Sequence, residues 1–134
     1  MTTTHPELYA NIGFVLYSIA ASDRRIAPAE VEVFKQQVKK NWLPLEDSTD
    51  EFGTDAAHYI SISISFDYAH EQGMSADDAF ERFKDHYRDA PGSYDEVTRQ
   101  LVRNTAAAIA AAFSGKNKAE LVRLAQVEAL FAHN

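Results

Sequence analysis

"ISISISFD", residues 60 to 67, decides the fold class of this chain of 134 residues. Apolar and polar residues alternate here with a period of two, which is typical of a half-buried β-strand. A strand needs a partner for its backbone N–H and C=O groups, and the rest of the sequence contains no second convincing strand. We therefore predict a helix from about Asp55 to Gln72 and an all-α protein.

Helical periodicity dominates before this stretch. An apolar stripe predicts a first helix deep in the core, formed by Leu8, Ile12, Val15, Leu16 and Ile19 and broadened by Phe14 and Tyr17. Pro28 suits the first turn of a second helix, because its missing N–H costs nothing there. This helix is predicted to end near Pro44, before an acidic loop over residues 43 to 54, and its apolar face contains Val31, Phe34 and Val38.

Three later helices are predicted from capping residues that stand three positions before an acidic residue, namely Ser75 with Asp78, Ser93 with Glu96, and Asn117 with Glu120. Their expected apolar stripes are, in turn, Phe80, Phe83 and Tyr87; Tyr94, Val97, Leu101, Thr105, Ala108 and Ala112; and Leu121, Leu124, Ala125 and Phe131. With the three helices predicted before residue 73, these make six predicted helices.

A single domain over residues 1 to 134, with a core from about 6 to 132, is expected, because this length supports one hydrophobic core. The chain has no cysteine, which excludes disulfides, thiolate zinc sites and thiol catalysis. The apolar run at residues 106 to 113 is far shorter than the about 20 residues of a membrane span. The run at residues 12 to 21 follows Glu7 and no basic residue, unlike a signal peptide, so the cytoplasm is the expected compartment.

The negative charge is concentrated in the middle of the chain. The net charge is -7, and residues 41 to 100 carry 14 acidic and 4 basic residues. Such a segment repels phosphate groups, so nucleic acid and anionic membranes are not expected as partners. We interpret the acidic excess chiefly as a solvated surface, with a site for cations or a basic partner as the alternative.

Two parts of the sequence resemble one another. Residues 19 to 34 align without a gap on residues 109 to 124, at an offset of 90 positions. Both segments contain Ile-Ala-Ala, and Glu30 aligns with Glu120. The common plan is a helix end, a short turn and a new helix, which predicts two pseudo-repeated helix-turn-helix hairpins.

The stretch "AASDRRIAPAE" resembles the TerB-like family, the helical domain associated with tellurite resistance. Members commonly carry an alanine-rich helix, then Asp-Gly, two residues, Ser-Pro, and a Glu seven positions after the Asp. Asp23, Pro28 and Glu30 match this pattern, whereas Arg24 replaces the glycine and Ala27 the serine. The resemblance implies an all-α bundle of six or seven helices and a suspected role for the paired acids in metal binding or partner contact, without implying a reaction.

Asp23 and Glu30 have two interpretations. In the first, which we favour, the free N–H groups of the second helix hold Asp23, and Glu30 is a first-turn acid. In the second, Asp23 and Glu30 bind a divalent cation with help from Glu120 or from the acidic loop. Calcium takes six to eight oxygen ligands, and a segment with two arginines between its acids does not supply them alone.

Two Asp-x-x-His pairs, Asp55 with His58 and Asp67 with His70, also suggest metal ligands. They stand twelve residues apart, which is about 120° out of phase on one helix. One helix face therefore does not hold both pairs. We favour the interpretation that each aspartate pairs with its histidine at the surface over a metal centre.

Trp42 is the only tryptophan, and it is interpreted either as an anchor for a partner or as a pin between the acidic loop and the core. No nucleophile elbow, phosphate-binding glycine loop or HExxH motif is present. The expected function is a non-enzymatic TerB-like module without a cofactor, which contacts an unidentified protein or serves a stress or metal response. The alternative is a divalent-cation sensor or metal-dependent enzyme that uses Asp23 and Glu30.

Overall fold

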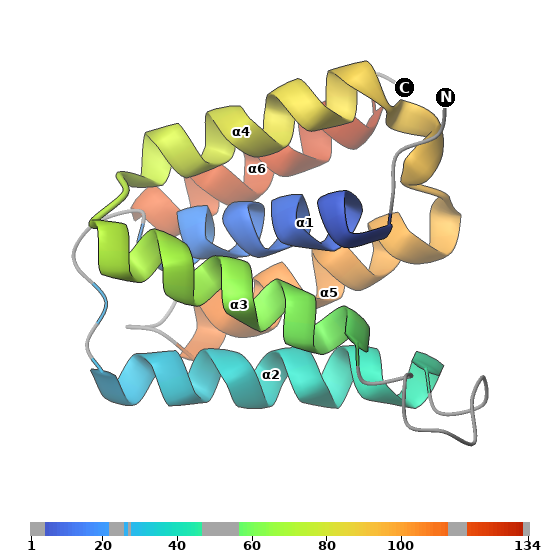
Figure 1. Cartoon of the computed structure of the whole chain (residues 1–134). Helices are drawn as coiled ribbons and strands as arrows, with labels where there is room; N and C mark the ends of the chain where they lie inside the picture. The colour runs from blue at the N-terminus through green and yellow to red at the C-terminus, as the bar shows by residue number, and fades with distance from the viewer. Residues whose placement is uncertain (1–4, 22–25, 27, 47–56, 113–117, 133–134) are drawn as a thin grey trace.

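The computed structural model describes residues 5–21, 26, 28–46, 57–112 and 118–132. These residues form six α-helices and one short 3-10 helix, and they include no strand (Figure 1). In chain order the elements are α1 (His5–Ala20), α2 (Pro28–Glu46), α3 (Ala57–Gln72), α4 (Ala76–Asp89), η2 (Pro91–Ser93), α5 (Glu96–Ala112) and α6 (Lys118–Ala132). The predicted all-α helical bundle is confirmed.

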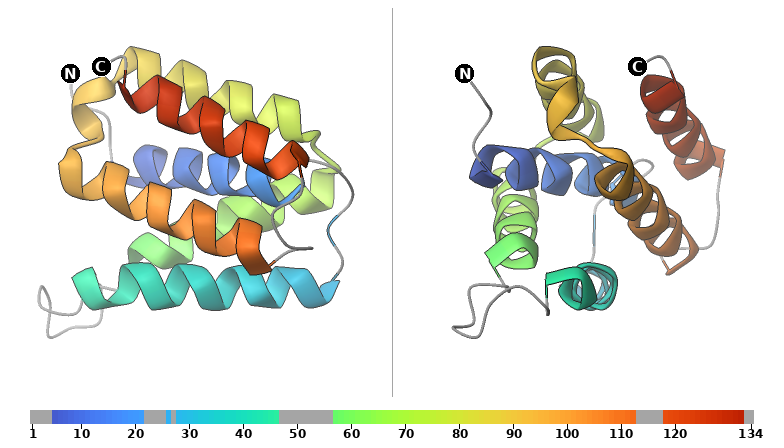
Figure 2. Two further views of the ribbon diagram at one scale, coloured as in Figure 1. Left: turned by 180° about the vertical axis from the view of Figure 1, so that it is seen from behind. Right: turned by 90° about the vertical axis from the view of Figure 1, so that its right-hand side faces the viewer.

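Helix α1 lies at the centre of the bundle. All of its residues from Ile12 to Ala20 are buried, and every residue of the predicted apolar stripe is among the buried ones. The helix contacts α3, α4, α5 and α6, and Figure 2 shows it between them. Because a helix that is apolar on all sides has no face for water, its formation depends on this enclosure.

Gly13 allows α1 and α3 to approach one another closely. A Cβ atom at this position would overlap Ser65 Oγ and would lie 2.6 Å from the carbonyl oxygen of Ile62. Ordinary van der Waals contacts of a Cβ atom begin at about 3.4 Å, so a larger residue does not fit without movement of a backbone. The closest contact between these two helices therefore depends on a glycine.

Residues 60 to 67 belong to α3, so the predicted helix is confirmed in place of a strand. The helix buries Ile62, Phe66 and Ala69, which are spaced by four and three residues. Phe66 stacks on Phe34 of α2, with ring centroids 3.6 Å apart and an angle of 18° between the rings. A helix satisfies its backbone hydrogen bonds internally, which is why the strand-like alternation does not decide the structure.

The end of α3 is closed by a glycine in the left-handed conformation. Gly73 has a φ of 66°, and its N–H donates to the carbonyl oxygen of His70 (3.2 Å). The N–H of Met74 donates to the carbonyl oxygen of Ala69 (3.0 Å). These two hydrogen bonds form a Schellman motif, which turns the chain sharply from α3 into α4.

The start of α4 follows the prediction, and its apolar stripe meets the last two helices. The Oγ of Ser75 accepts a hydrogen bond from the N–H of Asp78 (3.0 Å), so this cap is confirmed. Phe83 lies edge-on to Tyr94 (5.7 Å between centroids) and to Phe131 of α6 (6.1 Å). These buried aromatic residues, together with Tyr87, form the contact among α4, α6 and the segment before α5.

The predicted cap of α5 is wrong. Ser93 ends η2, α5 begins at Glu96, and Asp95 Oδ1 accepts a hydrogen bond from the N–H of Thr98 (2.8 Å). This hydrogen bond holds the pKa of the Asp95 carboxyl below its usual value. Serine and aspartate are both good capping residues, and only the turn at Pro91 leaves the aspartate in the capping position.

The predicted apolar stripes of α5 and α6 are partly wrong. Val97 and Leu121 are exposed, whereas Val102, Ile109 and Val127 are buried. Tyr94 precedes α5, so the helical spacing counted from it does not apply to Val97. In α6, a buried arginine occupies part of the inward face, which a count of apolar residues does not detect.

That buried arginine, Arg123, connects α6 to α4. Its guanidinium carbon lies 4.8 Å from the ring centroid of Phe80, and an Nη atom donates to the carboxylate of Asp77. The guanidinium group of Arg123 therefore packs against the ring of Phe80, while its positive charge is paired with the carboxylate of Asp77 at the surface.

The second helix ends near Pro44 as predicted, at Glu46, so residues 43 to 46 of the expected acidic loop belong to α2, while residues 47 to 54 lie outside the described residues. A proline this close to the end removes only one hydrogen bond of the last turns. The second helices of the two pseudo-repeats begin at Pro28 and Lys118, which are 90 positions apart, the offset of the sequence alignment. Their packing differs, since α6 lies against α5 and α1, whereas α2 lies against α5 and α3 (Figure 2).

Candidate functional site

The structure leaves the predicted cation site untested. Asp23 lies outside the described residues, and so does the side chain of Glu120, whose backbone belongs to the first turn of α6. Glu30 lies in the first turn of α2, as predicted, and is partly buried. Among the described residues, no group of three histidine or carboxylate side chains could hold a metal ion. The site formed by Asp23, Glu30 and Glu120 therefore stays a prediction.

Asp67 and His70 have separate partners. The carboxylate of Asp67 pairs with Lys35 Nζ of α2 (3.0 Å), and His70 Nε2 shares a hydrogen bond with the carbonyl oxygen of Ile26 (3.1 Å). Both contacts attach α3 to the chain at or near the start of α2. The favoured surface role of this pair is supported, and Asp55 and the side chain of His58 lie outside the described residues.

Trp42 belongs to the last turns of α2, and its side chain lies outside the described residues. Its proposed contact with a partner stays a prediction. Within the described helices, none is both long and apolar enough to cross a membrane.

The feature of the surface that calls for an explanation is a row of large apolar side chains on α3. Ile60, Ile64 and Tyr68 are 44%, 62% and 48% exposed. Residues four positions apart lie above one another on one helix face, so these three form a continuous stripe. We call them the α3 stripe. Single exposed apolar residues are common on proteins, whereas a contiguous row is a candidate site for contact with another surface.

Acidic residues lie along helix α4. Asp78, Asp85 and Asp89 of α4 are exposed, and their spacing of seven and four residues places them on one side of the helix. We call them the α4 acidic row. None of them forms an ion pair with another described residue. This side of α4 adjoins α1, because Arg82, which lies within the row, places its guanidinium carbon 5.4 Å from the ring centroid of Phe14.

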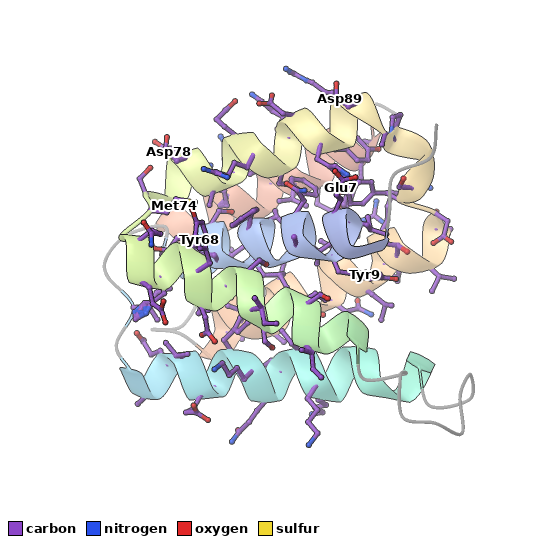
Figure 3. The ribbon with its side chains drawn as sticks, viewed as in Figure 1. Glu7, Tyr9, Tyr68, Met74, Asp78 and Asp89 are labelled. Atoms are coloured by element: carbon purple, nitrogen blue, oxygen red, sulfur yellow. The ribbon has the colours of Figure 1, made fainter. Side chains whose placement is uncertain are left out.

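The α3 stripe and the α4 acidic row approach one another where α3 turns into α4. Figure 3 shows Tyr68, Met74 and Asp78 one after another where α3 turns into α4. Glu7 of α1 and Asp89 lie in the same view at the opposite end of α4 (Figure 3). The exposed side of α3 also carries Glu71, seven residues after Ile64. Carboxylates thus lie near the Tyr68 end of the α3 stripe, while Lys35 of α2 pairs with Asp67 on another side of α3.

The sequence contained a signal for this surface, but its meaning depended on the secondary structure. In a strand, Ile60, Ile62 and Ile64 would share one face, whereas a helix buries Ile62 and exposes the other two. The spacing of Ile60, Ile64 and Tyr68 becomes informative only after the segment is assigned as a helix.

A second polar feature lies at the other end of α4. His86 Nδ1 shares a hydrogen bond of 2.8 Å with the hydroxyl of Tyr94, while His86 Nε2 is buried without a hydrogen-bond partner. Burial lowers the pKa of His86, although Glu7 and Asp89 oppose this change. Burial also raises the pKa of the Tyr94 hydroxyl above its usual value, so this group stays protonated. The pair is a neutral polar contact within the aromatic packing.

The lowered pKa of His86 predicts a loss of stability in weak acid. The unfolded chain binds a proton at this imidazole near its ordinary pKa of 6.5, whereas the folded protein binds it only at lower pH. The free energy of unfolding should therefore fall as the pH decreases through the interval between the two pKa values. Denaturant titrations between pH 8 and pH 5 measure this change in the wild type and in His86→Gln.

The His86→Gln variant is the control, because it retains the other four histidines. It should lose less stability than the wild type over the same pH interval. Equal losses in the two proteins would show that His86 is not the responsible group.

The geometry thus offers one candidate interaction surface and one structural polar pair. Comparisons of the chain with protein-family models, with curated proteins and with solved structures find no match, so its function is argued from these surfaces.

Proposed function

We propose that this chain is a non-enzymatic helical module that binds a protein partner through the α3 stripe and the adjoining α4 acidic row. The observation that carries the proposal is the exposure of Ile60, Ile64 and Tyr68 in one row of a helix. Transfer of apolar surface out of water stabilises a complex by about 25 cal/mol per Å². Covering this row would therefore contribute to affinity without changing the fold.

The distribution of the other exposed apolar residues supports the choice of this face. Val97, Leu121 and Val122 are the remaining large apolar residues that are exposed in the described part of the chain. Val97 stands alone near the start of α5, and the other two are adjacent in sequence, so they point in different directions on α6. Among the described helices, only α3 presents three such residues on one face.

A photo-crosslinking experiment tests this proposal. A benzophenone amino acid placed at position 64 should form a discrete adduct with a protein partner in the cells that make this chain. The same group at position 97 is the matched control, since Val97 is similarly exposed but lies on α5. Mass spectrometry identifies the adducts, and equal adducts at both positions, or none at position 64, would contradict the proposal.

The other sequence-based expectations remain predictions. They are the TerB-like resemblance with its link to tellurite resistance, the cytoplasmic location, and the divalent-cation function of Asp23 and Glu30. Metal analysis of the purified protein tests the last of these directly.

A further inference from the structure

We propose that the segment recognised by the α3 stripe and the α4 acidic row is a basic amphipathic α-helix. This inference rests on the proposed function, and it adds the chemical class of the partner. Its argument comes from the charges that border the apolar row.

The described charges on the α4 side of the stripe are predominantly negative, whereas on the α2 side Asp67 is already paired with Lys35. Asp78, Asp85 and Asp89 have no ion pair with a described residue, and Arg82 is the one basic residue within their row. Glu71 adds a further carboxylate on the exposed side of α3. Lysine and arginine side chains of a partner would pair with carboxylates of both α3 and α4. This pairing would reduce the repulsion among the carboxylates.

The same charges disfavour other occupants. A second copy of this chain would bring its own acidic row and a net charge of -7 toward the same face. An anionic membrane surface or a nucleic acid would be repelled in the same way. A basic protein segment is the occupant whose charge complements the surface.

The shape of the apolar row favours a helix as the bound segment. Ile60 and Tyr68 are eight positions apart on α3, or about 12 Å along its axis. A partner helix with apolar residues at spacings of three and four presents a row of the same kind, and it keeps its basic residues on the flanks. It satisfies its own backbone hydrogen bonds, so it needs no free strand edge on this all-α surface.

The experiment uses two designed helical peptides of about 18 residues, or five helical turns. Both carry leucine on one face, and the polar face carries lysine in one peptide and glutamate in the other. Binding to the full chain is measured by fluorescence anisotropy with the wild type, Ile64→Asp, Val97→Asp and the double variant Asp85→Asn with Asp89→Asn. Circular dichroism checks that each variant keeps its helices.

The lysine peptide should bind the wild type at least about tenfold more tightly than the glutamate peptide. Ile64→Asp should weaken its binding about tenfold or more, whereas Val97→Asp should leave it unchanged. The double asparagine variant should weaken it about two- to tenfold, and added salt should reduce the affinity, because the charges are exposed.

Three results would overturn the inference. If both peptides bind equally and Ile64→Asp weakens both, the docking surface stands but the partner is not selected by positive charge. If the lysine peptide binds Ile64→Asp as well as it binds the wild type, the attraction is purely electrostatic and does not use the stripe. If neither peptide binds, no amphipathic helix is recognised, and the crosslinking at position 64 separately decides the proposed function.

Discussion

Replacing Phe83 with alanine should lower the free energy of unfolding by about 3 to 5 kcal/mol. Phe83 is fully buried, and its ring contacts Phe80, Tyr87, Tyr94 and Phe131. Its removal would leave a cavity where α4, α6 and the segment before α5 meet, and rigid rings cannot close such a cavity easily. Domains of this size are stable by only about 5 to 15 kcal/mol, so the loss is a large part of the total.

The matched control is Leu121→Ala, which removes a large apolar side chain from an exposed position of α6. Its effect should stay within about 0.5 kcal/mol, the usual range for a surface position. Urea titrations of both variants provide the comparison. A large loss from Leu121→Ala and a small one from Phe83→Ala would mean that α6 presents its other face to the core.

The second large effect is expected from Gly13→Ala. In an ordinary helix this substitution raises the free energy of unfolding by about 0.5 to 1 kcal/mol, because alanine is the better helix former. Here the new methyl group would overlap Ser65 Oγ and would meet the Ile62 carbonyl oxygen at 2.6 Å. Overpacking costs about 1 to 3 kcal/mol or more, and a backbone oxygen cannot rotate away, so a net loss of stability is expected.

The variant Ser65→Ala, alone and combined with Gly13→Ala, tests the origin of this loss. Removing the hydroxyl should restore only part of the stability, because the Ile62 carbonyl and the Cβ of residue 65 remain close to position 13. A rise in stability from Gly13→Ala alone would show that α1 and α3 are not in close contact there.

Much of the fold could be predicted because its strongest signals are local. The central position of α1 follows from its apolar residues alone, and the cap at Ser75 from a serine three positions before an acid. The cap of α5 could not be assigned, because Ser93 and Asp95 are both competent caps and tertiary packing selects between them. The inward position of Arg123 likewise depends on Phe80 and Asp77, which stand more than 40 positions away in sequence.

The candidate surface could be predicted less well from the sequence than the fold could. Ile60, Ile62 and Ile64 are chemically identical, and only the packing of α3 on α1 makes one of them buried and the others exposed. The sequence pointed instead to Asp23, Glu30 and Glu120 as the alternative cation site, and Asp23 and the side chain of Glu120 lie outside the described residues. The surface proposed here arises from how two helices are rotated, which local sequence patterns do not fix.

The most direct test of the α3 stripe is a cysteine accessibility measurement. The chain has no cysteine, so single substitutions at positions 60, 62, 64 and 66 each introduce one unique thiol. In native protein, we expect rapid reaction with a thiol reagent at positions 60 and 64 and protection at positions 62 and 66 until the protein unfolds. Equal reactivity at all four positions would place them on one face, as in a strand, and would contradict the helical stripe on which the proposed function depends.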